Sequence, residues 1–89
     1  MNDTEIKLRI VEKMARKEFV GNSSVHKDDA TNWVASHDQG RARELLNEMT
    51  TDRDVPVVES ARGHLRLTSM ADAVEFIRDN DGDVPWNAR

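Results

Sequence analysis

The spacing of apolar residues divides the chain into four segments with helical periodicity and one segment with strand-like alternation. The predicted helices span residues 3–19, 27–35 and 39–51, and a last helix begins after Ser69. In each of them apolar residues recur three and four positions apart, which places them on one helix face. Between the first two helices, Val25 can pair briefly as an extended residue. The third helix has the clearest stripe, formed by Ala42, Leu45, Leu46 and Met49.

Polar residues mark where two of these helices begin. Ser36 precedes Gln39 by three positions, which is the spacing of a capping box, and Asp38 is an alternative cap for the same helix. Ser69 is followed by Asp72 at the same offset. These patterns predict side-chain caps at the start of the third and the last helix.

The stretch PVVESARGHLRLTS predicts a β-hairpin between the third and the last helix. Val57 and Val58 indicate its first strand, and Leu65 and Leu67 alternate with polar residues in the second. Gly63 can adopt a positive φ at little cost, as a tight hairpin turn requires. Two choices of loop both place Val58 on the same face as the two leucines, so we expect that face to be buried. Because an isolated hairpin is marginally stable, it must pack on the helices.

The predicted order is helix, helix, turn, helix, hairpin, helix, which makes the fold class mainly α with a small β-hairpin. Over residues 5–78 this order resembles the winged helix-turn-helix family, in which the hairpin is called the wing. The run ARG at 61–63 would be the tip of the wing, and HLRLTS resembles the second wing strand of many archaeal regulators. The resemblance implies a winged-helix domain at 1–78, followed by an acidic C-terminal tail at 79–89.

The resemblance also implies a function, that of a DNA-binding transcriptional regulator. The third helix would enter the major groove with its N-terminal part against base edges, and the wing would lie along the adjacent backbone. Arginine can bond guanine or phosphate through its planar fork, and glutamine or asparagine can pair with adenine. The residues expected to contact double-stranded DNA are Gln39, Gly40, Arg41, Arg43 and Asn47 on the helix, with Arg62, His64 and Arg66 on the wing.

Acidic residues on the same surface keep a second interpretation open. Glu44 stands in the middle of the expected contact face, and a carboxylate repels phosphate unless it is paired with an arginine or bonds a cytosine amino group. Arg41 with Glu44 or Glu48 can be an ordinary pair on a helix surface. Arg66 opposite Glu59 can be an ordinary cross-strand pair. In this interpretation the chain is a winged-helix module that binds protein and not DNA.

The overall charge opposes DNA binding, but its distribution does not. The chain has 17 acidic and 13 basic residues, a net charge of −4. Aspartate outnumbers glutamate and arginine outnumbers lysine, which leaves open a halophilic, archaeal source or an ordinary acidic domain. Residues 60–66 carry two arginines, one histidine and no acid, whereas 72–83 carry five acids against Arg78. Arg62 has no evident partner nearby, so it is the preferred functional arginine.

Composition excludes several other classes of function. The absence of cysteine excludes disulfides and thiolate metal sites, and no run of 18 apolar residues predicts a membrane span. Without a secretory signal in the sequence, we expect a cytoplasmic location. His26, His37 and His64 lie on different elements without metal-ligand spacing, so no metal or cofactor is predicted. A chain of 89 residues hardly encloses a substrate cavity, so we expect no enzyme activity and assign no catalytic residue.

The two tryptophans have different expected roles. Trp33 lies on the apolar stripe of the second helix, where we expect it in the core. Trp86 follows Pro85 in an otherwise polar segment, where an aromatic ring has no local reason to be. Winged-helix regulators are often dimers through their first and last helices, so the resemblance implies a homodimer. Its expected interface residues are Ile6, Ile10, Phe76 and Trp86.

Overall fold

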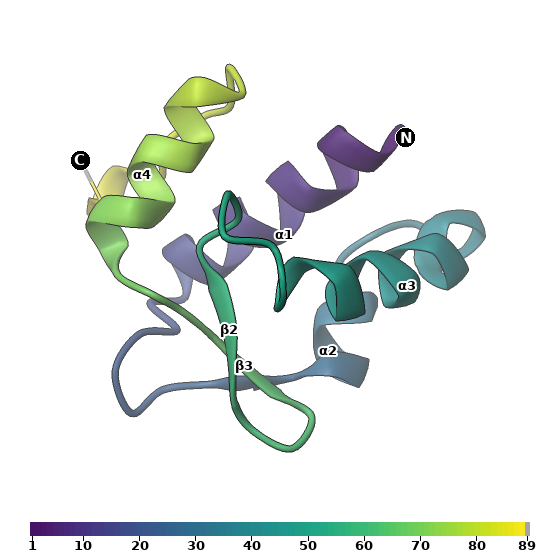
Figure 1. Ribbon diagram of the computed structural model, residues 1–89. Coiled ribbons are helices and arrows are strands. Elements are labelled where there is room, and N and C mark those ends of the chain that lie inside the picture. The colour runs from purple at the N-terminus through teal and green to yellow at the C-terminus, as the bar shows by residue number, and fades with distance from the viewer. Residues whose placement is uncertain (89) are drawn as a thin grey trace.

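Across residues 1–88, which the structure describes, the computed structural model has four α-helices and a three-stranded antiparallel sheet (Figure 1). Two short 3-10 turns complete it. The elements are α1 (Asp3–Arg16), β1 (Val25–His26), α2 (Lys27–Thr31), η1 (Ser36–Asp38), α3 (Gln39–Met49), β2 (Val57–Ala61), β3 (His64–Leu67), α4 (Met70–Asp79) and η2 (Trp86–Ala88). The prediction of a mainly helical chain with a hairpin before the last helix is therefore confirmed.

Side chains cap three helices at their N-termini, and at α2 the cap is Nδ1 of His26, which accepts from the Asp28 N–H at 3.1 Å. The Ser69 hydroxyl accepts a hydrogen bond from the Asp72 backbone N–H at 3.0 Å, which confirms the cap predicted for α4. The Asn2 side chain accepts from the Glu5 N–H at 2.8 Å and caps α1 in the same way. Each bond satisfies one of the backbone donors that a helix leaves free at its start.

The cap predicted for α3 was wrong. Ser36 lies in η1, which continues directly into the helix, and Asp38 occupies the N-cap position without a side-chain cap bond. The preceding turn itself uses the backbone donors, because Asp38 N–H bonds Ala35 and Gln39 N–H bonds Ser36. The largely buried Asp38 carboxylate instead lies 3.2 Å from Nε2 of His37.

Two helices end earlier than their apolar periodicity predicts. α1 ends at Arg16, and Glu18 adopts a positive φ of 58° that reverses the chain. α2 ends at Thr31, so Trp33 lies beyond it. The Trp33 ring is half-buried and stacks on Phe19, with ring centroids 6.1 Å apart. It packs against the edge of the core, whereas the prediction placed it in the interior.

The sheet joins the hairpin to the segment before α2. Its strand order is β1-β3-β2, so β3 is central and β2 lies at one edge. Val25 pairs with Leu65, which confirms the brief extended pairing expected at Val25. The Leu67 N–H also donates to the Phe19 carbonyl at 2.7 Å. The hairpin is thereby held by the segment that follows α1 as well as by its own two strands.

The register of the hairpin corrects the prediction for its buried face. Val57 pairs with Leu67 and is 1% exposed, whereas Val58 pairs with Arg66 and is half-buried. The register shifts between Glu59 and Ala61, where an irregularity interrupts the ladder. Alternate side chains of a strand point to opposite faces, so the shift of one residue exchanges the roles of the two valines.

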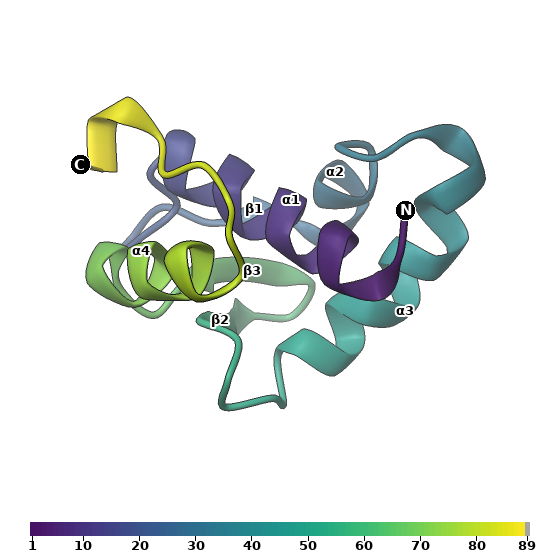
Figure 2. The same ribbon diagram turned by 90° about the horizontal axis from the view of Figure 1, so that it is seen from above.

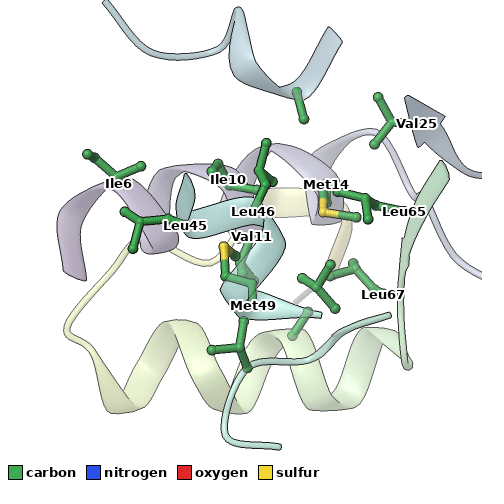
Figure 3. Packing of buried hydrophobic residues seen from close by; sticks show 14 of the residues in the cluster. Ile6, Ile10, Val11, Met14, Val25, Leu45, Leu46, Met49, Leu65 and Leu67 are labelled. Carbon is green, nitrogen blue, oxygen red and sulfur yellow. The ribbon is translucent and has the colours of Figure 1, made fainter. Parts of the chain in front are cut away.

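The core surrounds α1, which contacts α3, α4 and β3 (Figure 3). Its fully buried large side chains come from these four elements and from β2, and are Ile6, Ile10, Val11, Met14, Leu45, Leu46, Met49, Val57, Leu65, Leu67 and Ile77. Because Ile6 and Ile10 have no exposed surface, they cannot contribute to the dimer interface expected of them. They fill the interior of the single chain instead.

The residues after α4 pack back along α1 (Figure 2). The Asp83 N–H donates to the Glu12 carboxylate at 3.0 Å, and the Asn87 amide donates to the Ala15 carbonyl at 3.1 Å. Pro85 between them is buried. The segment predicted as a separate acidic tail is therefore attached to the folded domain through residue 88, and Arg89 lies outside the described residues.

The two adjacent valines of β2 provide a test of the register. We expect Val57→Ala to lower the free energy of unfolding by about 1–3 kcal/mol, because it removes two methyl groups from a closed core. The matched variant Val58→Ala should lower it by less than about 1 kcal/mol, since that side chain is already partly in water. Urea denaturation followed by circular dichroism measures both. Equal losses, or a larger loss for Val58→Ala, would contradict the register.

Candidate functional site

Lys27, at the start of α2, contacts both the outer face of α3 and the hairpin. Its ammonium donates to the Asn47 side-chain oxygen on α3 at 3.0 Å and lies 3.5 Å from the Glu59 carboxylate on β2. Its backbone N–H donates to the Gly63 carbonyl at 2.8 Å. Lys27 therefore fixes the position of the hairpin relative to α3.

The hairpin tip is shaped by Gly63, which has a φ of 78°. Its N–H donates to the Glu59 carboxylate at 2.7 Å. This hydrogen bond lowers the pKa of Glu59 below its ordinary value, and the nearby charge of Lys27 lowers that pKa further. A Cβ on Gly63 would lie 2.9 Å from Nε2 of His26, so the tip also depends on the absence of a side chain here.

Arg41 is held by two carboxylates. Its guanidinium forms a two-point contact with Asp3, with N···O distances of 2.9 and 2.6 Å, and a third contact with Glu44 at 2.7 Å. The hydrogen bonds from Arg41 lower the pKa of Asp3, and those to Asp3 and Glu44 raise the pKa of Arg41. The pairing of Arg41 with Glu44 considered from the sequence is confirmed, and Asp3 adds a link from α3 to α1.

Two further residues expected to contact DNA from α3, Arg43 and Gln39, also have hydrogen-bond partners, and a third, Gly40, has no side chain. Arg43 donates to Asp28 of α2 at 2.7 Å, and this bond lowers the pKa of Asp28. The Gln39 amide donates to the Val34 carbonyl at 3.3 Å and is half-buried, so it is turned partly away from solvent. Gly40 is exposed, and a Cβ added to it would meet no atom within 4 Å.

The three residues expected on the wing differ in how freely they can bind. Arg66 faces Val58 and bonds the Leu67 carbonyl at 3.2 Å, so the cross-strand pair with Glu59 considered from the sequence was wrong. The irregularity in the ladder moves Glu59 opposite Leu65 instead. His64 is exposed, and its ring lies edge-on to that of His26, with centroids 5.3 Å apart.

Arg62 is the most accessible cation of the wing. It is exposed at the tip, and no hydrogen bond or ion pair involves its side chain within residues 1–88. Its charge acts on Glu59 at longer range and contributes to the lowered pKa of that carboxyl group. Of the predicted arginines, Arg62 can therefore contact an anion without first leaving a partner.

The ion pairs on this surface lie in solvent, which limits how firmly they hold. In the Arg43–Asp28 pair the side chains are 56% and 64% exposed. Water and salt screen such pairs strongly, so they contribute little to stability and exchange partners readily. The surface as a whole carries arginines and carboxylates side by side. An incoming anion therefore competes with Asp3, Asp28 and Glu44 for the two arginines.

Sequence reasoning missed three charged residues of this surface. Lys27, Asp3 and Asp28 contact α3 or the hairpin although they lie on other elements. Their contacts span 15 to 38 positions along the chain, beyond the reach of helix or strand periodicity. The run KDD at the start of the second predicted helix was the available signal, because its charged side chains can pair with those of the helix that follows.

Comparison with known proteins gives no match, since no family model, curated protein or solved structure is significantly similar to the chain. Within the part of the chain that the structure describes, no cluster of histidine and acidic side chains is suited to a metal ion. No helix in that part combines the length and apolar character that a membrane span needs.

Two glycines of this surface provide a paired test of the hairpin tip. Gly63→Ala should destabilise the protein by at least about 1–2 kcal/mol, because alanine is strained at positive φ and its methyl group would meet His26. Gly40→Ala should instead stabilise it by up to about 1 kcal/mol, because alanine favours the helix and space is free around it. Urea denaturation measures both, and a Gly63→Ala protein as stable as the wild type would show that the tip is built differently.

Proposed function

We propose that the chain is a winged helix-turn-helix protein that binds double-stranded DNA and acts as a transcriptional regulator. What supports the fold assignment is the order α1-β1-α2-α3-β2-β3-α4, with β3 between β1 and β2 in the sheet. The observation that carries the proposal is the placement of the hairpin beside the exposed face of α3, joined to it through Lys27. In this geometry one duplex can contact the helix and the wing together.

The proposed contacts follow from which groups are accessible. The N-terminal half of α3 enters the major groove, and exposed Gly40 lets the backbone approach closely. Arg43 exchanges the carboxylate of Asp28 for a phosphate or a guanine edge. Arg62 contacts the backbone from the wing tip without giving up a partner. Asn47 reads a base only if it releases Lys27, so we assign it a secondary role.

The ion pairs make the proposed binding less dependent on salt than is usual. An arginine already paired with a carboxylate has lost much of its local positive potential, so fewer condensed counterions leave the DNA when it binds. In a salt-rich host, where the Debye length falls to about 3 Å at 1 M, the excess acidic charge also repels DNA only at short range. Shape and specific contacts then supply the affinity.

A second candidate function is that of a protein-binding winged-helix module. The observation that favours it is the pairing of Arg41 and Arg43 with Asp3, Glu44 and Asp28. A protein partner can contact such a mixed surface through both charges, whereas DNA uses the cations alone. The two candidates differ in what happens when the cations are removed.

We expect the double variant Arg43→Ala with Arg62→Ala to bind duplex DNA at least about tenfold more weakly than the wild type, because it loses two phosphate or base contacts. Fluorescence anisotropy of a labelled random duplex, titrated at about 0.1 M and at multi-molar KCl, measures the affinity. The matched control is Arg9→Ala with Arg16→Ala, which removes the same charge from the exposed side of α1.

The outcomes separate the two candidates. A loss confined to the Arg43 and Arg62 variant, with its circular dichroism unchanged, supports DNA binding at this surface. Equal losses in both variants would mean attraction by overall charge alone. If the wild type binds neither random nor host genomic DNA at either salt concentration, the protein-binding function replaces the first proposal.

We further propose that the protein forms a homodimer through the outer face of α4 and the C-terminal turn. Trp86 is 81% exposed, which is unusual because it leaves the apolar surface of a large ring in water. Met70, Val74 and Ala88 line a shallow hollow on the adjoining face of α4. This interface retains Trp86 from the sequence prediction, while Ile6 and Ile10 remain in the core. The half-buried Phe76, also predicted for the interface, lines a different groove beside α4.

Light scattering after size-exclusion chromatography tests the dimer. The wild type should elute with twice the 10.1 kDa mass of the chain, and dilution should convert it to monomer. Trp86→Ala should raise the dissociation constant at least about tenfold, as expected for an aromatic residue in the centre of an interface. A wild-type mass of one chain at every concentration would exclude this dimer.

A further inference from the structure

A groove of about 590 Å³ lies between α4 and the loop that joins α3 to β2. This loop projects from the body of the molecule beside β2, at the bottom of Figure 2. The floor of the groove is apolar, because its buried or half-buried lining residues include Val55, Pro56, Val57, Val58 and Phe76. Its size is within the range of sites that bind ligands or short segments of a partner.

Carboxylates surround this apolar floor. Asp52 and Asp54 lie on the loop, Asp72, Glu75 and Asp79 lie on α4, and Arg53 is the single base among the lining residues. Within residues 1–88, none of these five acids forms an ion pair, although those around α3 do. The concentration of acids predicted for 72–83 is thus combined with acids from the loop into one unneutralised rim.

Hydrogen bonding leaves this groove rich in acceptors and poor in donors. The Val55 N–H bonds the Asp52 carbonyl, Pro56 has no N–H, and the Val57 N–H bonds the Val55 carbonyl. The hydroxyls of Thr50 and Thr51 donate to carbonyls of the last turn of α3. The negative end of the α3 dipole also faces this loop. The groove therefore favours a ligand that carries several donors and positive charge.

That ligand must carry its positive charge on several separate groups. No three of the described acidic and histidine side chains come close enough together to hold one metal ion, so a single divalent cation does not fit the rim. Phosphates are repelled by five unpaired carboxylates, which excludes DNA from this face. An apolar floor between separated acids matches a chain in which basic and apolar side chains alternate.

We propose that the groove binds a basic, partly apolar peptide segment of a partner protein. Lysine or arginine side chains of the segment bond the carboxylates on the two walls, and its apolar side chains cover Val58 and Phe76. Because Val55, Pro56 and Val57 offer no free donor, recognition depends on side chains and not on addition of a strand. This proposal is independent of DNA binding, which uses α3 and the wing.

The test uses three labelled heptapeptides in fluorescence anisotropy at about 0.05 M and 0.15 M salt. In the first, lysines alternate with leucine and valine. In the second, serines replace the apolar residues, and in the third, glutamines replace the lysines. Spermine serves as a competitor that has positive charge without side chains. Backbone NMR shifts of the wild type locate the site.

A matched pair of variants separates local from overall charge. Asp54→Asn with Asp72→Asn removes one carboxylate from each wall, and the amide oxygen at 72 can still accept from Thr68. Asp29→Asn with Asp81→Asn removes the same charge outside the groove, again from a first helical turn and a loop. Circular dichroism and urea denaturation show whether both variants remain folded.

We expect the first peptide to bind most tightly, with shifts at residues 50–58 and 72–80. The groove variant should bind it about threefold to tenfold more weakly, and the control variant within about twofold of the wild type. Equal weakening by both variants, or equal binding of the first two peptides, would overturn the proposal. Competition by spermine as strong as that by the peptide would reassign the groove to small polyamines, and absence of binding would reject it.

Discussion

The structure depends on the burial of one face of α1 by α3, α4, β3 and the C-terminal turn. In a chain of 89 residues, this helix contacts α3, α4, β3 and the C-terminal turn, and five of its residues are completely or almost completely enclosed. Small domains bury a modest fraction of their surface, so a core of this size needs every element that covers it. The position of α3, and with it the whole candidate surface, is set by contacts with a helix that itself has no proposed functional role.

Once the core has taken nearly all large aliphatic residues, function must be carried by charge and by a few exposed rings. The charges are arranged in two different ways. Around α3 each of two arginines is matched by carboxylates from neighbouring elements, whereas the acids of the groove beside α4 form no ion pair within residues 1–88. One surface is therefore close to neutral and adaptable, and the other has a fixed preference for cations.

The sequence predicted those features that depend on short-range pattern. The helices of α1, α3 and α4, the Ser69 cap and the positive φ at Gly63 all follow from residues within a few positions of one another. The exchange of Val57 and Val58 shows where this ends, because a single irregular residue in a hairpin reverses every side chain before it.

The sequence predicted which residues lie on the candidate surface, but not which partners their side chains bind. Arg41, Arg43 and Asn47 do lie on α3, yet apart from Glu44 their partners come from α1 and α2. Such pairs depend on how helices cross, which is a tertiary property that periodicity does not contain. The packing of the C-terminal segment on α1 was missed for the same reason, since acidic composition alone resembles a solvated tail.

The pairing of Val25 with Leu65 has a consequence for how the chain folds. Forty residues separate these partners along the sequence, and they include α2, α3 and the first strand of the hairpin. The loop closure entropy of this contact is offset only when the intervening elements are already in place. The pairing of β1 with β3 thus encloses α2 and α3, and we expect the two-residue strand β1 to pair late in folding.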